Sequence, residues 1–181
     1  MASKRETTID DLYHVDGKAE IVGGELVLMS PGSGLHGRAA GRIFASLLSY
    51  EDRTKCGYAI PDNVGFVVRL PNRRSFSPDA AFCSQAPTEK FIDGAPMFAV
   101  EVRSEEDYGP VSERTIAAKR ADYFAAGTLI VWDVDVLRQH VIRLYRATAP
   151  DAPIIYRRGE RADAEPALPG WSMPVDDVCL R

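Results

Sequence analysis

The fold is decided by two stretches, Pro78-Asp79-Ala80-Ala81-Phe82 and Met97-Phe98-Ala99-Val100-Glu101-Val102. Apolar runs of this length, bounded by Pro, Asn and Gly clusters, are typical of buried strands. Each run also carries one acid, and an ionised carboxylate in a buried strand costs free energy unless a proton, a base or a cation compensates it. Asp79 and Glu101 therefore predict a site where something neutralises both carboxylates.

The clearest helix is predicted over residues 112–126, where it follows the second of these strands. Pro110 precedes it, Ser112 is its expected N-cap, and Gly127 can end it in the left-handed conformation. Lys119 shares the apolar side of this helix with Tyr123. A Lys on an apolar helix face is as unusual as an acid in an apolar strand, and the two features explain each other if the helix packs over the strand ends.

The remaining expected elements lie before and after these strands and this helix in the sequence. Residues 19–29 form two strand-like runs around Gly23-Gly24, which predicts a β-hairpin. Residues 35–50 repeat apolar side chains at helical spacing, with Ser33 as the expected N-cap. Further strands are predicted at 65–70, 129–135, 140–146 and 153–157. Residues 1–13 read as a short helix or a loose arm, and the tail after Glu160 reads as loop until Trp171 packs back.

This order of strands and helices predicts one α/β (α+β) domain over residues 1–181, with a mixed sheet flanked by helices. Apolar residues make up 45% of the chain and charged residues 27%, as in ordinary globular proteins. The three cysteines lie far apart, so neither a disulfide framework nor a zinc knuckle is expected.

The absence of a signal peptide or a membrane span in the sequence predicts a cytoplasmic protein. The net charge of −4 does not favour nonspecific nucleic-acid binding.

Asp79, Glu101 and Lys119 together predict a metal site of hard oxygen ligands beside a cation. Such ligands suit Mg²⁺ or Mn²⁺ rather than zinc. A metal of this kind lowers the pKa of a bound water and stabilises negative charge that develops on phosphate oxygens. The ammonium group orients the nucleophile or shares that charge.

The ordered motifs resemble a bacterial restriction-endonuclease family that is abundant in cyanobacteria and belongs to the PD-(D/E)XK nuclease superfamily. The resemblance covers nearly the whole chain, and it rests on residues 19–31, His36, 77–79, 100–104, Lys119, Tyr123, Gly127, 131–135 and 168–171. It implies a divalent-metal endonuclease that hydrolyses DNA, with Asp79 and Glu101 as metal ligands, Lys119 as the catalytic cation and Glu25 as a third carboxylate. A homodimer is expected for the class, because duplex cutting breaks two strands.

The chain departs from the superfamily pattern at Arg103, where a Lys two residues after Glu101 would be expected. Either Arg103 replaces that Lys, or Lys119 reaches the same point from the helix. We favour Lys119, because a Lys on the buried side of a helix has no other explanation than a site that needs its charge. The stretch Glu105-Glu106-Asp107 also differs from the Ser-Pro-Ser common in the family.

Structural interpretations stand beside these functional ones. Asp79 can serve in a turn or a cap, and Glu101 can form a buried ion pair with Arg103 or Lys119. Glu25 can be merely solvated, His36 can be a capping residue rather than a phosphate contact, and Tyr123 fits the core better than catalysis. Two alternative functions remain: a non-catalytic nucleic-acid-binding or regulatory module with the nuclease fold, and, more weakly, a glycosidase with paired carboxylates. The basic pairs are Arg73-Arg74 and Arg157-Arg158, and such pairs are usually solvated.

Overall fold

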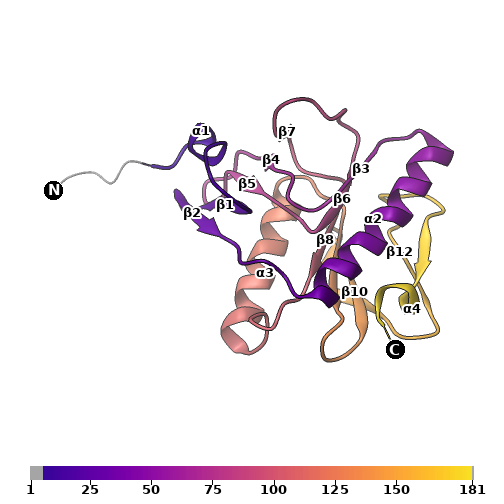
Figure 1. Ribbon diagram of the computed structural model, residues 1–181. Coiled ribbons are helices and arrows are strands. Elements are labelled where there is room, and N and C mark those ends of the chain that lie inside the picture. The colour runs from indigo at the N-terminus through magenta and orange to yellow at the C-terminus, as the bar shows by residue number, and fades with distance from the viewer. Residues whose placement is uncertain (1–5, 181) are drawn as a thin grey trace.

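A mixed six-stranded sheet forms the centre of the protein, as the computed structural model of residues 6–180 shows (Figure 1). The strand order is β11-β10-β9-β8-β6-β3. β8 and β9 are parallel, and every other neighbouring pair in this sheet is antiparallel. The strands are β3 (Tyr58–Ile60), β6 (Ala80–Cys83), β8 (Phe98–Val102), β9 (Ile130–Asp135), β10 (Val141–Arg146) and β11 (Ala149–Tyr156).

Helix α3 (Pro110–Ala125) is the crossover that the parallel pair β8 and β9 requires. The helix begins at Pro110, so the expectation that Ser112 caps it was wrong. Pro110 occupies the first turn, where its fixed φ suits a helix start, and Gly109 takes the cap position with a φ of +99°. The Ser112 hydroxyl donates instead to the Glu106 carbonyl at 2.7 Å.

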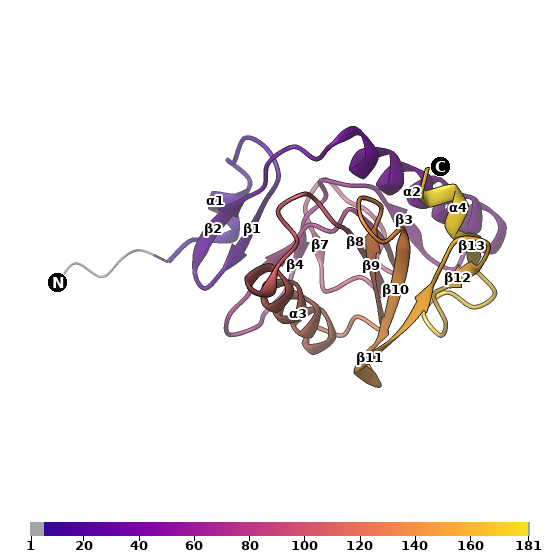
Figure 2. The same cartoon turned by 90° about the horizontal axis from the view of Figure 1, so that it is seen from below.

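The two faces of the sheet are covered by different elements. Helix α2 (Gly34–Thr54) packs on one face, over an apolar core that includes Val100 and Trp132. The opposite face is covered by α3 and by a small sheet of three strands, and Figure 2 shows α2 and α3 on opposite sides of β8 to β10. The small sheet consists of β5 (Ser75–Phe76), β4 (Phe66–Val67) and β7 (Ile92–Asp93).

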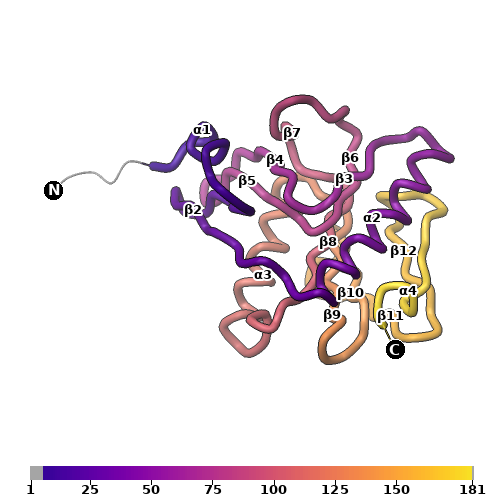
Figure 3. The backbone as a smooth tube through the Cα atoms, viewed as in Figure 1, coloured from indigo at the N-terminus to yellow at the C-terminus, as the bar shows by residue number. Residues whose placement is uncertain are grey.

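A hairpin of β1 (Ala19–Val22) and β2 (Glu25–Leu28) forms around Gly23 and Gly24, whose φ values are +58° and +77°. Backbone hydrogen bonds fasten β1 to residues 72–74, because Gly23 N donates to Asn72 O at 2.7 Å and Arg74 N donates to Ile21 O at 3.0 Å. Figure 3 traces the chain from this hairpin to the start of α2. The hairpin therefore brings β1 to the edge of the small sheet.

The predicted architecture, a mixed sheet flanked by helices with an N-terminal hairpin, is confirmed. Ser33 caps α2 as expected, and the helix continues four residues beyond the predicted end at Tyr50. The first helix, α1 (Ile9–Leu12), begins after Thr8, while residues 1–5 of the predicted arm lie outside the described residues.

The prediction of loop after Glu160 was wrong. That segment forms β12 (Arg161–Asp163), β13 (Ser172–Pro174) and α4 (Val175–Val178), because the first two strands pair with each other. Trp171 does pack back as expected, with its ring 5.1 Å from that of Trp132.

Candidate active site

Asp79 and Glu101 face each other across β6 and β8. Ala80 pairs with Val100 in the antiparallel register, so the next positions along the two strands are Asp79 and Glu101. Asp79 N donates to Val100 O at 2.9 Å, and Val102 N donates to Asp79 Oδ2 at 2.7 Å. The charge of Asp79 also acts on the Glu101 carboxyl, so the two groups are electrostatic neighbours. The strand pairing therefore places the two carboxylates side by side.

The Asp79 carboxylate is buried and fully engaged. Lys18 Nζ lies 2.6 Å from its Oδ1, and His36 Nε2 lies 3.2 Å from its Oδ2. Burial acts to raise the pKa of Asp79, but the hydrogen bond from His36 and the charge of Lys18 outweigh it and hold the pKa below the usual range. Asp79 is therefore a carboxylate that stays ionised.

The Glu101 carboxylate has a different electrostatic environment. Lys119 Nζ lies 2.8 Å from its Oε1, and the Tyr123 hydroxyl donates to the same oxygen at 2.6 Å. The side chain keeps 27% of its surface exposed. Burial raises the pKa of Glu101, and the neighbouring charge of Asp79 adds to this against the opposing effect of Lys119. The two carboxylates thus have pKa values shifted in opposite directions.

Lys119 also binds a third carboxylate, that of Glu20 on β1. Its Nζ lies 2.9 Å from Glu20 Oε1, and this oxygen also accepts from Ser77 N at 2.8 Å. Arg73 reaches the other Glu20 oxygen at 2.6 Å. Burial lowers the tendency of Lys119 to carry charge, yet Glu101 and Glu20 together raise its pKa above the ordinary value. Lys119 is consequently a fixed ammonium between two acids.

The structure places Glu20 of the hairpin against Lys119, whereas Glu25, the expected third carboxylate, lies on the other strand of the hairpin. Glu25 opens β2 beside the turn and is exposed, whereas Glu20 is only 3% exposed. The sequence contained the signal for Glu20, because it is an acid between Ala19 and Ile21 in an apolar strand. This is the same anomaly that identified Glu101.

Arg103 is directed away from the carboxylates toward β9. It donates to both oxygens of Asp133 at 2.7 Å, and it also pairs with Glu113 at the start of α3. The hydrogen bond to Asp133 raises the pKa of Arg103, and Glu113 adds to this effect. Of the two basic candidates, the structure therefore places Lys119 beside Glu101, while Arg103 ties the end of β8 to β9 and α3.

Tyr123 combines the two interpretations open to it. Its ring is fully buried and stacks on Phe76 with the centroids 3.9 Å apart. Its hydroxyl nevertheless donates to Glu101, and burial raises the pKa of that hydroxyl well above the usual value. Tyr123 is a core residue that holds one oxygen of the candidate site.

The donor set fits a hard divalent cation held by two carboxylates. Within residues 6–180, no three His, Cys, Asp or Glu side chains are grouped so that they could hold a metal ion. Mg²⁺, however, is usually bound by one or two carboxylates, with waters and substrate phosphates completing its coordination. Asp79 and Glu101 satisfy that requirement.

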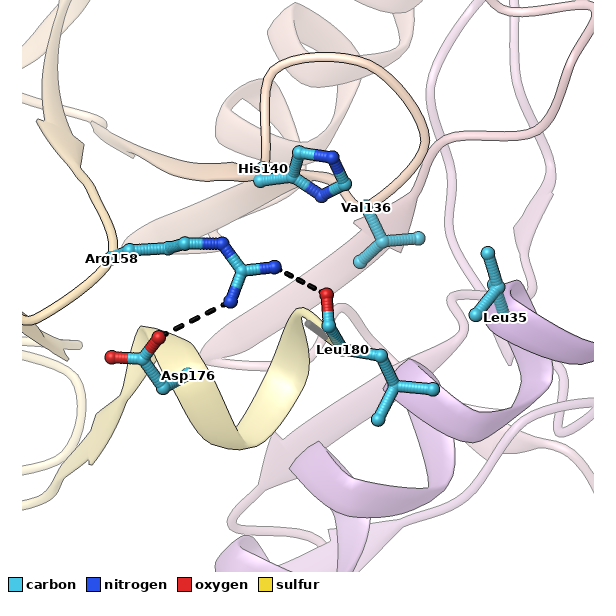
Figure 4. Close-up of a pocket in the computed structure, with 6 residues that line it drawn as sticks. All are labelled: Leu35, Val136, His140, Arg158, Asp176 and Leu180. Carbon is cyan, nitrogen blue, oxygen red and sulfur yellow. Dashed lines mark hydrogen bonds and ion pairs between the residues drawn. The ribbon is translucent and has the colours of Figure 1, made fainter.

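A separate hollow of about 600 Å³ lies near the C-terminal end of the described chain (Figure 4). Arg158 crosses it and binds Asp176 at 3.2 Å and the Leu180 carbonyl. Its lining residues are Leu35, Val136, His140, Arg158, Asp176 and Leu180, none of which belongs to the carboxylate site.

The mixed sheet flanked by helices, with the hairpin beside it, is a restriction-endonuclease-like fold. The chain belongs to the Uma2 family, described as "Putative restriction endonuclease", which matches residues 8–176. Its fold is similar to that of a protein from Anabaena variabilis ATCC 29413 described as "a putative nuclease belonging to DUF820". The TM-score is 0.75 at 14% identity, over 95% of this chain and 97% of the other. No curated protein matches the sequence.

Proposed function

We propose that the protein is a divalent-metal-dependent endonuclease that hydrolyses DNA phosphodiester bonds. The family and the fold support a nuclease. The observation that carries the proposal is the placement of Asp79 and Glu101 at the same end of the β6–β8 pair, with Lys119 2.8 Å from Glu101. Buried acids beside a fixed cation are the arrangement in which a metal and a phosphate can be held together.

In this proposal Asp79 and Glu101 hold Mg²⁺ or Mn²⁺. The bound metal would supply a water of lowered pKa and would stabilise negative charge on the phosphate. Asp79 suits a ligand because its pKa is lowered, so it presents a carboxylate at neutral pH. Glu101 keeps part of its surface exposed, which leaves the site open to substrate.

Lys119 would act as a fixed positive charge. Because its pKa is raised, it remains an ammonium at neutral pH and cannot accept a proton from water. It would therefore orient the nucleophile and share the charge of the phosphate oxygens. Glu20 would act as a positioning group, since it pairs with the ammonium and is itself held by Arg73 and Ser77 N.

The test is a plasmid-nicking assay with Mg²⁺, with Mn²⁺ and with EDTA, on the wild type and on Asp79→Ala and Glu101→Ala. We expect nicking in the presence of metal for the wild type and its loss in both variants. Asp52→Ala is the matched control, because this acid is exposed on α2 and pairs only loosely with Lys55 at 3.3 Å. Metal-dependent nicking that survives in both site variants would refute the proposal.

The alternative from another class is a nucleic-acid-binding or regulatory module without turnover. Two features of the sequence count against turnover and keep this alternative open: the acidic net charge of −4, and Arg103 at the position where the superfamily pattern has a Lys. Calorimetry distinguishes the two functions: an endonuclease must bind Mg²⁺ or Mn²⁺ at millimolar concentration, and the absence of such binding would support the non-catalytic module.

We also propose that the chain is a single domain and acts as a homodimer, because cutting a duplex breaks two strands and symmetric dimers are the commonest oligomers. Light scattering on the purified protein gives the mass in solution, and a monomeric mass with and without DNA would contradict the dimer.

Among residues 6–180, no helix is long and apolar enough to cross a membrane.

A further inference from the structure

Lys18 occupies the position where a cation would meet Asp79. It lies just before β1, and its backbone carbonyl is held by Met29 N at 3.0 Å. Its ammonium is 2.6 Å from Asp79 Oδ1 and 2.7 Å from Asp62 Oδ1, with 17% of the side chain exposed. A single positive charge thus sits between two carboxylate oxygens at hydrogen-bonding distance from both.

The two oxygens of Asp79 have different partners. Oδ2 accepts from Val102 N at 2.7 Å and lies 3.2 Å from His36 Nε2, so the strand pairing and α2 hold it. Within residues 6–180, the Lys18 ammonium is the one hydrogen-bonding partner of Oδ1. A divalent cation bound by Asp79 is therefore directed to the oxygen that Lys18 occupies.

Asp62 provides a second place for the same ammonium. It follows β3 and is 43% exposed, and the hydrogen bond from Asn63 N at 2.7 Å fixes its Oδ1. Because Lys18 already contacts Asp62, its ammonium can leave Asp79 without losing every partner. The exchange requires only a side-chain movement toward solvent.

We propose that Lys18 is an internal competitor of the divalent cation at Asp79, and that Asp62 retains the Lys18 ammonium once the cation binds. Lys18 thereby sets the metal affinity of the site. The inference rests on the proposed metal ligands, because it requires a cation to be held by Asp79. Its physical basis is the repulsion between an ammonium and a divalent ion that share one oxygen, which is strong where water is partly excluded.

The experiment is isothermal calorimetry of Mn²⁺ binding to the whole chain without DNA. Lys18→Met should bind Mn²⁺ at least roughly tenfold more tightly than the wild type, since one close positive charge is removed. Lys18→Gln keeps a polar group without the charge and should show the same change. Lys55→Met is the matched control, because it also removes an ammonium from an ion pair but at an exposed position of the surface. It should leave the affinity unchanged.

Asp62→Asn tests the second half of the inference. It should weaken Mn²⁺ binding in the wild type, because the displaced ammonium loses its acceptor. In the Lys18→Met background the same change should weaken binding less, since no ammonium needs an acceptor. An equal effect in both backgrounds would mean that Asp62 acts only through its charge, and that part of the inference would be overturned.

Affinity that is unchanged or weaker in folded Lys18→Met and Lys18→Gln overturns the competitor role, and so does the absence of Mn²⁺ binding in every variant. Circular dichroism confirms the fold of each variant. The outcome is independent of cleavage. Tighter binding in Lys18→Met without any nicking by the wild type would support the inference while rejecting the endonuclease, and nicking with unchanged affinity would do the reverse.

Discussion

The ammonium of Lys119 lies 2.9 Å from the carboxylate of Glu20, so α3 and the N-terminal hairpin meet at one ion pair. The same ammonium lies 2.8 Å from Glu101. Glu20 is almost completely buried, and Lys119 is its contact with the candidate site. This arrangement makes one side chain responsible both for stability and for the charge beside Glu101.

Lys119→Met should lower the free energy of unfolding by about 3–5 kcal/mol, because it leaves Glu20 buried with one partner fewer. The double variant Glu20→Gln with Lys119→Met should lose less than the sum of the two single variants, since the uncompensated charge is gone. Urea denaturation measures all four proteins. Strict additivity would show that the Glu20–Lys119 pair carries no coupling free energy.

Glu20→Gln should destabilise the protein at neutral pH and less so in acid. Burial acts to raise the pKa of Glu20, but Lys119 and Arg73 lower it below the ordinary 4.5. Its stabilising contribution is therefore present above about pH 4.5 and is lost as the pH falls through the lowered pKa. Urea denaturation at several pH values between 3 and 7 should show the difference between wild type and variant shrinking below that point.

Glu25→Gln is the matched control, because it makes the same chemical change on the exposed strand of the same hairpin. It should change stability by no more than about 0.5 kcal/mol and leave nicking intact. A loss of nicking in Glu25→Gln with activity retained in Glu20→Gln would support Glu25 as the third carboxylate.

The two proposed metal ligands should respond differently to amide substitution. Asp79→Asn should cost about 2 kcal/mol, because Lys18 and His36 lose a charged acceptor. Glu101→Gln should cost less than about 1 kcal/mol, since burial and the charge of Asp79 already disfavour its ionised form. Thermal denaturation in EDTA gives both values, and the opposite ranking would contradict the pKa shifts described above.

Arg103→Met should destabilise the protein by about 3–5 kcal/mol, because buried Asp133 keeps only the longer contact of 3.7 Å to Arg143, and it should not weaken Mn²⁺ binding by the folded fraction. Its guanidinium pairs with Asp133 and Glu113 rather than with Glu101. Calorimetry and denaturation separate the two effects. Loss of metal binding in a folded Arg103 variant would place Arg103 in the site after all.

The placement of Glu101 and Lys119 could be predicted from the sequence because each is a charged residue in an apolar pattern. Glu20 has the same signal, but the family resemblance implied Glu25 as the third carboxylate. Lys18 carries no local signal, because a Lys before a strand is ordinary and only the approach of Asp79 gives it meaning. Only contacts between segments that are distant in the sequence identify residues of this kind.

The short strands were missed for a similar reason. β7, β12 and β13 are two or three residues long, and pairing with another strand rather than local propensity forms them. Helix α3 begins at Pro110 after Gly109, which has a positive φ. The sequence predicts a later start because Ser112 is a common N-cap residue.

The attachment of β1 to residues 72–74 limits how long the candidate site stays assembled. Lys18 and Glu20 both belong to this one hairpin segment, which backbone hydrogen bonds join to Asn72 and Arg74. If those bonds open together as a local unfolding unit, Asp79 and Lys119 lose a partner at the same moment. Amide exchange at Gly23 and Arg74 would then report the lifetime of the assembled charges.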